Sequence, residues 1–298
     1  MSSVLTVDGV TKYYGRIRAL NNVSFEVPQA SVFGVLGPNG SGKTTLLSII
    51  LDVLKATKGD FLWFGHPGSP EQRKKIGSLL ETPNFYHYMS AVDNLEISAS
   101  IKGITNPDID GVLKKVNLYQ HKDSKFQTYS LGMKQRLAIA SCLLGDPEVM
   151  VFDEPTNGLD PVGIAEIRDL IKRLAKEGKT IIMASHLLDE VEKVCTHVAI
   201  LKKGVLIAQG HVDEILVNDD IVEVSSGNNE QLRAALQTMT AYTKIDAFEN
   251  DKMTIHFPPG TADLAQVNAH CFKQGIVLNH LVAKKKSLES KFIELTNE

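Results

Sequence analysis

The residues best suited to chemistry in this chain form one glycine-rich stretch, Gly37-Pro38-Asn39-Gly40-Ser41-Gly42-Lys43-Thr44. The stretch fits the pattern GxxxxGK[ST], and the apolar residues 32–36 before it predict a buried strand. Glycines let consecutive backbone N–H groups turn inward around phosphate oxygens, and a helix that begins near Lys43 points its positive end at the same anion. We expect Lys43 to reach the β- and γ-phosphates of a nucleotide and Thr44 to ligate Mg²⁺. The alternative, a glycine turn that binds nothing, is disfavoured by this strand–turn–helix context.

Two acids follow a second apolar run, residues 149–152, which also predicts a buried strand. The strand ends at Asp153 and Glu154, and an unpaired buried carboxylate is unfavourable, so a function for these acids is expected. We expect Asp153 to hold Mg²⁺, directly or through water, and Glu154 to act as general base toward an attacking water. Two exposed turn acids are the alternative. The 110 positions between Lys43 and Asp153 predict a sizeable insertion between the two motifs.

The elements around these motifs alternate between strand and helix, which predicts an α/β fold with a parallel sheet. Residues 71–145 are expected to be largely helical, with a break at Thr105-Asn106-Pro107. The other expected elements are strands at 4–7, 23–27, 61–64 and 180–184, helices at 44–54 and 163–177, and a hairpin of 198–201 with 205–208.

The pattern changes after about residue 218, where the order βαββαβ predicts a small ferredoxin-like module. The boundary is placed at residues 212–220. The expected elements are strands at 221–224, 244–248, 253–257 and 276–281, helices at 230–239 and 262–273, a turn at 249–251 and a final helix at 287–295.

Length and composition limit the possible classes of protein. The 298 residues suggest about two domains at ~150 residues each. The net charge of −3 gives no support to nucleic acid as an electrostatic partner. The apolar run 137–145 is too short for a membrane helix, which needs ~18 residues, and the N-terminus lacks a secretion signal. Three cysteines, odd in number and far apart, indicate reduced thiols.

Residues 129–136, Tyr-Ser-Leu-Gly-Met-Lys-Gln-Arg, complete a family resemblance. With the two motifs above, they make residues 4–215 similar to the ATP-binding subunit of an ABC transporter, whose signature is LSGGQ-x-x-R. Ser130 and Gly132 fit the signature, whereas Leu131 replaces Gly and Met133 replaces Gln, which removes the contacts of that Gln side chain. The segment lies 23 residues before Asp153, as the family requires. The resemblance implies that Ser130 and Gly132 bind the γ-phosphate held by an opposite subunit.

The resemblance assigns further residues. It implies that Tyr14 stacks on adenine, with Tyr13 as the neighbouring candidate, that Asp160 crosses a dimer interface, and that His186 touches the γ-phosphate. Glu81 stands where most family members have Gln. In the family, the residue at this position contacts Mg²⁺ and begins the segment that faces the membrane partner. The expected catalytic residues are Lys43, Glu154 and His186; the metal ligands are Thr44, Glu81 and Asp153; and the nucleotide-binding residues are Tyr14, Gly37, Pro38, Asn39, Gly40, Ser41, Gly42, Lys43, Thr44, Thr45, Glu81, Ser130, Gly132, Asp153 and Asp160.

The implied fold is a P-loop NTPase of ABC type with an antiparallel β subdomain, a helical insertion and a small α+β C-terminal module. We expect an ATP-binding domain at 1–215, its helical subdomain at about 82–145, and an accessory module at 221–298. ATP and Mg²⁺ are the expected cofactors. The expected partners are a second copy of the chain in a head-to-tail dimer and a separate transmembrane permease, with no nucleic acid.

The implied function is ATP hydrolysis that powers export, at the inner face of the cell membrane, and Glu81 and the C-terminal residues resemble ABC-2 exporters of peptide antibiotics. A soluble ABC ATPase that acts on ribosomes or DNA is the first alternative, disfavoured by the single phosphate loop and the short insertion. A nucleotide sensor without turnover is the second, disfavoured by Lys43, Glu154 and His186. Import of a substrate, in place of export, is the third alternative.

Overall fold

The chain divides into two compact units, Met1–Val212 and Asp213–Glu298. The computed structural model describes residues 2–80, 84–216, 220–239, 242–246 and 252–284, with Leu288 and Phe292. Each unit has its own buried apolar cluster, one around the strands of the first unit and one around the small sheet of the second.

An antiparallel sheet opens the first unit, with strand order β2-β1-β4-β5. Its long strands alternate buried and exposed positions because one face packs on the core while the other faces outward. Leu5, Val7 and Val10 of this sheet share a buried cluster with Leu46 and Leu47. The strands are β1 (Ser3–Tyr14), β2 (Ile17–Pro28), β4 (Lys58–Trp63) and β5 (His66–Pro67).

The second sheet of this unit has the order β10-β9-β3-β8-β7-β6, and β9, β3, β8, β7 and β6 run parallel. All residues of β3, β7 and β8 are buried, which confirms the strands expected from the apolar runs. The carboxyl ends of these three strands therefore meet at one edge. The strands are β3 (Val32–Leu36), β6 (Ile76–Leu79), β7 (Val149–Asp153), β8 (Thr180–Ser185), β9 (His197–Lys202) and β10 (Val205–His211).

Strand β6 corrects the expectation that residues 71–145 are largely helical. It pairs in parallel with β7, from Ile76 opposite Val149 to Leu79 opposite Phe152. A run of four residues is too short for hydrophobic periodicity to distinguish a strand from a helix. Only the pairing with β7 identifies this segment as a strand.

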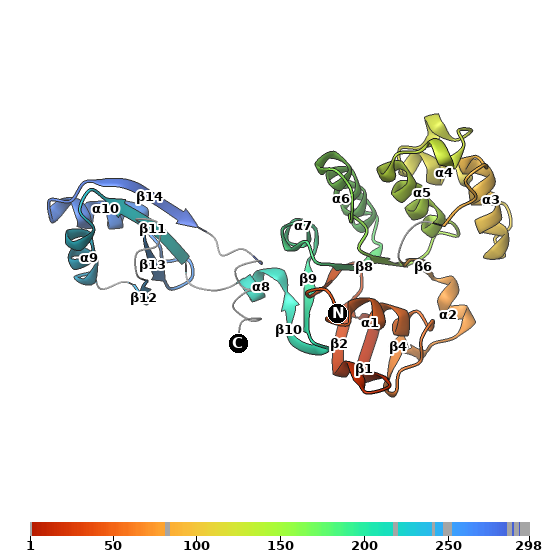
Figure 1. Cartoon of the computed structure of the whole chain (residues 1–298), viewed down its shortest axis with the longest axis horizontal. Coiled ribbons are helices and arrows are strands. Elements are labelled where there is room, and N and C mark those ends of the chain that lie inside the picture. The colour runs from red at the N-terminus through yellow and green to blue at the C-terminus, as the bar shows by residue number, and fades with distance from the viewer. Residues whose placement is uncertain are drawn as a thin grey trace. The chain divides into compact units, whose positions relative to one another are not determined.

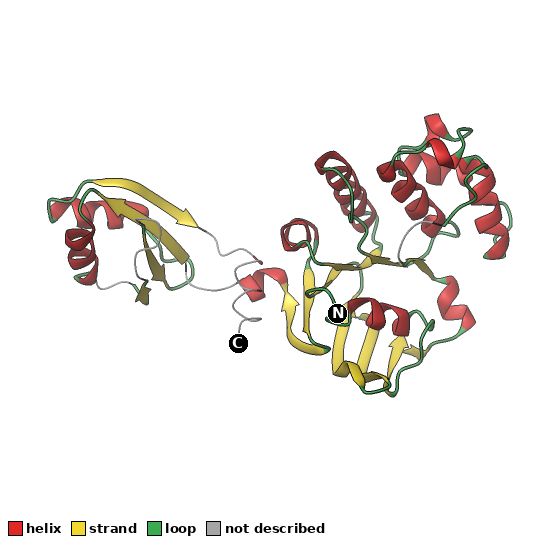
Figure 2. Cartoon of the chain, in the orientation of Figure 1, coloured by secondary structure: helices red, strands yellow, loops and turns green. Residues whose placement is uncertain are grey.

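Helices cover both faces of the parallel sheet. Figure 1 shows α1 on the side of β1, β2 and β4, whereas α6 and α7 lie on the other side. Helices α3, α4 and α5 form a purely helical subdomain (Figure 2), and the expected break at Thr105-Asn106-Pro107 separates α3 from α4. The helices are α1 (Lys43–Ile50), α2 (Pro70–Lys74), α3 (Ala91–Ile101), α4 (Ile109–Lys115), α5 (Leu131–Leu143), α6 (Pro161–Lys176), α7 (Leu188–Val194) and α8 (Val212–Leu216), with 3-10 turns at Tyr119–His121 and Phe126–Thr128.

The second unit has the expected order βαββαβ, with the antiparallel strand order β12-β13-β11-β14. Leu232, Leu236 and Val267 from its helices are buried with Val222 and Val224 of the sheet, as their helical spacing predicts. The elements are β11 (Asp220–Ser226), α9 (Asn229–Gln237), β12 (Lys244–Ile245), β13 (Met253–Phe257), α10 (Leu264–Lys273) and β14 (Leu278–Lys284).

Two expectations for this unit cannot be compared with the structure. The turn at 249–251 lies outside the described residues, as does the helix at 287–295 apart from Leu288 and Phe292. In the described part of the chain, no helix combines the length and the apolar character that a membrane crossing requires.

Candidate active site

The glycine-rich loop connects β3 to α1 at the carboxyl edge of the parallel sheet. Gly40 and Gly42 have φ angles of 78° and 105°, values that favour glycine. A Cβ atom on Gly42 would also lie 2.7 Å from the carbonyl oxygen of Ala19. Gly42 caps α1 without any side-chain hydrogen bond, and the first turn of α1 carries no acid, so the positive end of the helix faces the loop.

Lys43, the first residue of α1, is 6% exposed and directs its ammonium group along the loop. Its Nζ donates to the carbonyl oxygens of Gly37, at 2.8 Å, and Pro38, at 3.4 Å. The same atom lies 3.5 Å from Oε1 of Glu154. A cation held among backbone oxygens and one carboxylate is suited to bind phosphate oxygens that enter this loop.

Thr44 and Asp153 come together from different elements, as expected for a shared metal. The Thr44 hydroxyl donates to Oδ2 of Asp153 over 2.7 Å, and Asp153 is 5% exposed at the end of β7. A hydroxyl and a carboxylate are hard oxygen ligands, and Mg²⁺ takes its other ligands from waters and substrate phosphates. This donor set therefore fits Mg²⁺. Glu81, the third expected ligand, lies outside the described residues.

Glu154 and His186 follow the adjacent strands β7 and β8 and contact each other. Nδ1 of His186 lies 2.8 Å from Oε2 of Glu154, and the His186 backbone N–H donates to the same oxygen over 3.4 Å. Glu154 has a φ of 48°, a left-handed conformation that is unfavourable for this residue type. Its backbone N–H donates to the carbonyl of Ala184 over 3.0 Å, which fixes this strained turn against β8. Glu154 thus lies between the Lys43 ammonium and the His186 imidazole.

Ser130 and Asp160 have local roles within one chain. Each is the N-cap of a helix: Ser130 Oγ accepts from the N–H of Met133 at 3.3 Å, and Asp160 Oδ1 accepts from the N–H of Gly163 at 2.7 Å. Gly132, in the first turn of α5, has open space where a Cβ would lie. These residues are not part of the described contacts that join Lys43, Glu154 and His186.

Tyr14 and Tyr13 end strand β1 and are 46% and 41% exposed. The Nζ of Lys12 lies 5.3 Å from the centre of the Tyr14 ring. The hairpin of β1 and β2 reaches the phosphate loop, since the Ala19 carbonyl lies against Gly42. A half-exposed ring at the end of this strand is suited to stack on a planar base.

Sequence reasoning missed the turn that supports the loop from the side of β9 and β10. The N–H of Gly204 donates to the carbonyl of Ser41 over 2.9 Å, and its own carbonyl accepts from Asn21 over 2.8 Å. With a φ of 79°, and with Ala19 O only 2.4 Å from where a Cβ would lie, this position requires glycine. The sequence predicts only a hairpin of 198–201 with 205–208 here, because the contact of Gly204 with Ser41 joins residues far apart in the chain.

Comparisons with known proteins identify the family. Residues 20–157 match the family model described as ABC transporter. The chain is 38% identical to the uncharacterized ABC transporter ATP-binding protein YhcH of Bacillus subtilis, over 100% of this chain and 97% of that protein. It is 31% identical to the bacitracin transport ATP-binding protein BcrA of Enterococcus faecalis, over 99% and 97%.

A solved structure has the same cassette. A dimeric ATP-binding cassette in a post-hydrolysis state, bound to ADP and Pi, aligns with a TM-score of 0.61 and 27% identity, covering 70% of this chain and 98% of that one. The likeness confirms the P-loop α/β fold and an ATP-hydrolysing cassette. This chain belongs to the ABC transporter family, as an ATP-binding subunit that hydrolyses ATP.

Proposed function

We propose that the chain hydrolyses Mg²⁺-bound ATP at the edge of β3, β7 and β8 and thereby powers export through a separate permease. The contact series Lys43–Glu154–His186, beside the Thr44–Asp153 pair, is the observation that supports the proposal. The proposed roles, a phosphate-binding cation, a metal-binding carboxylate and a base, require such a lysine and two such carboxylates close together at one sheet edge.

In this mechanism the loop N–H groups and Lys43 bind the phosphates, whose oxygens replace Gly37 O as acceptors from the ammonium group. Thr44 and Asp153 would hold Mg²⁺, and the ion would supply positive charge beside the phosphate oxygens. Glu154 accepts a proton from the water whose oxygen bonds to the γ-phosphorus. The bond between the γ-phosphorus and the β–γ bridging oxygen breaks, and ADP and inorganic phosphate leave. His186 positions Glu154 through its ring nitrogen and its backbone N–H.

A head-to-tail dimer completes the proposed site. Ser130 and Gly132 of one chain would face the phosphates held by Lys43 of the other, and Asp160 would lie at the interface. Two copies around a two-fold axis would give two equivalent sites. Residues 1–215, with a helical subdomain at about 82–145, would form this ATPase domain, and residues 221–298 an accessory module.

The names of the relatives support the proposal of export and of a membrane partner. BcrA is named for bacitracin transport and matches nearly the whole chain, so we carry export of a peptide antibiotic or a similar compound over to this protein. The compact βαββαβ unit differs from the larger β-rich domain that importer subunits often add. Because YhcH and BcrA are transporter proteins, the ribosome or DNA alternative is not retained. The chain would act at the inner face of the membrane, bound to its permease.

The decisive experiment is to search the neighbouring genes for one that encodes a multi-span membrane protein and to co-express that protein with this chain. We expect the two proteins to co-purify in detergent, and we expect ATP-dependent extrusion from cells or vesicles that stops in Glu154→Gln. An ATPase that never associates with a membrane protein, or whose partner takes up cargo instead of extruding it, would contradict the proposal.

A further inference from the structure

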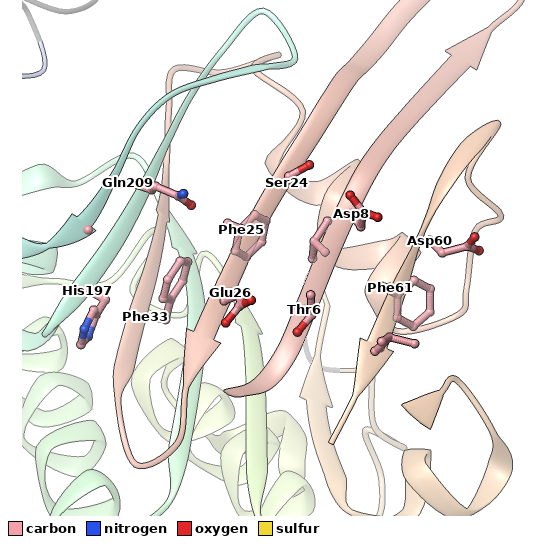
Figure 3. Close-up of a pocket in the computed structure, with 13 residues that line it drawn as sticks. Thr6, Asp8, Ser24, Phe25, Glu26, Phe33, Asp60, Phe61, His197 and Gln209 are labelled. Atoms are coloured by element: carbon pink, nitrogen blue, oxygen red, sulfur yellow. The ribbon is translucent and has the colours of Figure 1, made fainter. Parts of the chain in front are cut away.

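Two cavities outside the proposed ATP site differ in the charge of their lining. The first, of about 740 Å³ beside the antiparallel sheet, has three acids and no lysine or arginine among the lining residues that the structure describes. These acids are Asp8, Glu26 and Asp60 (Figure 3). The second, of about 410 Å³, has Arg73, Lys74 and Lys102 and no acid in its described lining, and is named the basic cavity below. An anion would be repelled by the first cavity and attracted to the second.

The basic cavity lies where three segments that are distant in the chain come together. Its lining comes from residues 70–76, which form α2 and the start of β6, from residues 102–104 after α3, and from residues 144–145 before β7. Gly145 has a φ of 81°, and a Cβ atom there would lie 3.0 Å from Cδ1 of Ile104, so these two loops approach each other closely. A ligand in the cavity would contact the helical subdomain and the α/β part of the first unit at once.

Two of the three cations have no carboxylate partner in the described part of the chain. Arg73 is neutralised by Asp52, since its Nη1 lies 2.6 Å from Oδ2 of that residue. Lys74 and Lys102 form no ion pair there, and Glu71 of α2 acts on Lys74 only through a longer-range interaction. Two ammonium groups that face one cavity repel each other, and an anion between them would relieve this repulsion.

Lys102 keeps hydrogen-bonding capacity for a ligand. It follows α3, and its Nζ donates to the carbonyl of Ser141 in the last turn of α5. Burial is the main cause that lowers the pKa of Lys102. The nearby Cys142 thiol does not neutralise this cation, because burial raises the pKa of the thiol to about 12. An ammonium group has three N–H donors, so two remain after the bond to Ser141.

The rest of the lining of the basic cavity is largely apolar. Pro70, Ile76, Ile104 and Leu144 contribute hydrocarbon surface beside the cations. Ile104 and Leu144, with Gly145, also line an adjoining cavity of about 410 Å³, so the apolar surface continues beyond the lysines. This combination suits a ligand that has a charged end and an apolar body.

The charged residues of the adjoining cavity already have partners within the chain. Its lining includes two acids and one lysine, and each of the three is bound by another residue. The partners are Lys179 for Asp146, Glu177 for Lys115 and the backbone N–H of Gly111 for Asp108. The adjoining cavity therefore has room for an uncharged part of a ligand, whereas the basic cavity attracts the charged part.

We propose that the basic cavity binds a small organic anion, a single phosphate or carboxylate group borne on an apolar body. Lys74 and Lys102 bind the charged oxygens, and Ile76, Ile104 and Leu144 contact the apolar body. Two ammonium groups match the charge of about −1.5 to −2 of one phosphate monoester at pH 7. The volume of the cavity lies within the range of about 300–1,000 Å³ that is typical of small-molecule sites. The inference needs no membrane partner and is independent of the proposed export function.

The binding can be tested on the full chain with 8-anilinonaphthalene-1-sulfonate, whose sulfonate on an apolar body stands in for the ligand and whose fluorescence reports binding. A non-hydrolysable ATP analogue fills the ATP site throughout. Hexyl phosphate should displace the probe, whereas equal concentrations of inorganic phosphate or hexanol should not. Lys74→Gln/Lys102→Gln should weaken binding of hexyl phosphate about tenfold, because each exposed ion pair contributes up to about fivefold in affinity.

A matched control variant removes equal charge elsewhere. Lys172→Gln/Lys176→Gln replaces two exposed lysines of α6 and should bind hexyl phosphate like wild type. Both variants should unfold at the wild-type temperature, since the replaced side chains are exposed. Equal losses of affinity in both variants, or no loss in Lys74→Gln/Lys102→Gln, would overturn the proposal. Displacement of the probe by inorganic phosphate or by hexanol as readily as by hexyl phosphate would also overturn it.

Two sources of the anion can be distinguished with vesicles. Sedimentation of wild type with vesicles of phosphatidylcholine and phosphatidate, lost in Lys74→Gln/Lys102→Gln, would assign the cavity to the phosphate of a lipid. Displacement of the probe by hexyl phosphate without sedimentation would assign it to a soluble anion. ATP hydrolysis enters none of these measurements, so failure of the inference would leave the proposed function intact.

Discussion

Two glutamates, one in each unit, have similar neighbours in very different places. Glu154 lies 3.5 Å from Lys43 and 2.8 Å from His186. Glu223, in β11, lies 3.7 Å from Lys252 and 3.5 Å from His280, and it also pairs with Lys284. A carboxylate between a lysine and a histidine is thus not sufficient to define a catalytic site.

The two glutamates differ in backbone conformation and in their place in the fold. Glu223 occupies a regular strand position opposite Thr254 and Val282. Glu154 follows a buried parallel strand, has a φ of 48°, and lies next to a glycine loop and a helix N-terminus. Strained backbone of this kind tends to occur at functional sites. The comparison indicates that the position at the sheet edge and beside the loop, rather than the charges, distinguishes the proposed catalytic cluster from the cluster around Glu223.

The largest expected effect is that of Lys43→Ala. Each charge-assisted hydrogen bond contributes about 1.5–3 kcal/mol, so losing two to phosphate should weaken ATP binding by about 10²–10⁴-fold and abolish measurable turnover. Lys252→Ala removes the corresponding cation beside Glu223 and should leave both quantities unchanged. Equilibrium binding of a fluorescent ATP analogue and phosphate release would measure them. Near wild-type hydrolysis by Lys43→Ala would mean that the site is misplaced.

Glu154→Gln should separate binding from chemistry. The amide keeps the shape but cannot accept the proton of water, and a general base typically supplies about 10²–10⁴-fold in rate. We expect kcat to fall in that range, ATP affinity to persist, and gel filtration with ATP to show a longer-lived dimer. Glu223→Gln is the matched control and should keep full activity. A Glu154→Gln protein that turns over normally would remove the base from the mechanism.

The position of most residues in the proposed catalytic cluster could be predicted because the sequence signals are local. Val32–Leu36 and Val149–Asp153 are short apolar runs that end directly in the glycine loop and in Asp153 and Glu154. Parallel pairing then brings these strand ends together by a general rule. The same rule predicts the place of His186, after β8, but not its 2.8 Å contact with Glu154.

The features that were missed depend on contacts between distant residues. Strand β6 is defined by its pairing with β7, and Gly204 by its contact with Ser41. The pairing of Asp8 opposite Asp60 likewise joins two strands, β1 and β4, that are separated by β2, β3 and α1 in the chain. No periodicity within one segment contains this information.

A smaller effect is expected when Glu223 is replaced. The hydrogen bond from Lys284 is the main cause that holds the pKa of Glu223 below its ordinary value of 4.5. The carboxylate therefore stabilises the second unit above about pH 4.5, and this contribution disappears as pH falls through the lowered pKa. Glu223→Gln should lower stability at pH 7 by less than about 1 kcal/mol and have no effect well below pH 4.5. Calorimetry as a function of pH would measure the unfolding of the second unit. Glu154→Gln, in the first unit, is the control and should leave that unfolding unchanged.

The smallest expected effect on the ATP site is that of removing the second unit. Residues 220–284 contain no nucleotide motif, and their buried cluster consists of their own side chains, among them Val222, Leu236 and Val267. The loop, Lys43, Asp153, Glu154 and His186 all belong to the first unit. A chain that ends at residue 216 should therefore fold and bind ATP with wild-type affinity, even if the dimer is less stable. Circular dichroism would establish folding and titration with an ATP analogue would measure affinity. Loss of ATP binding by this folded truncated chain would show that the second unit helps to build the ATP site. Glu154 and Glu223 would then both belong to regions that ATP binding requires.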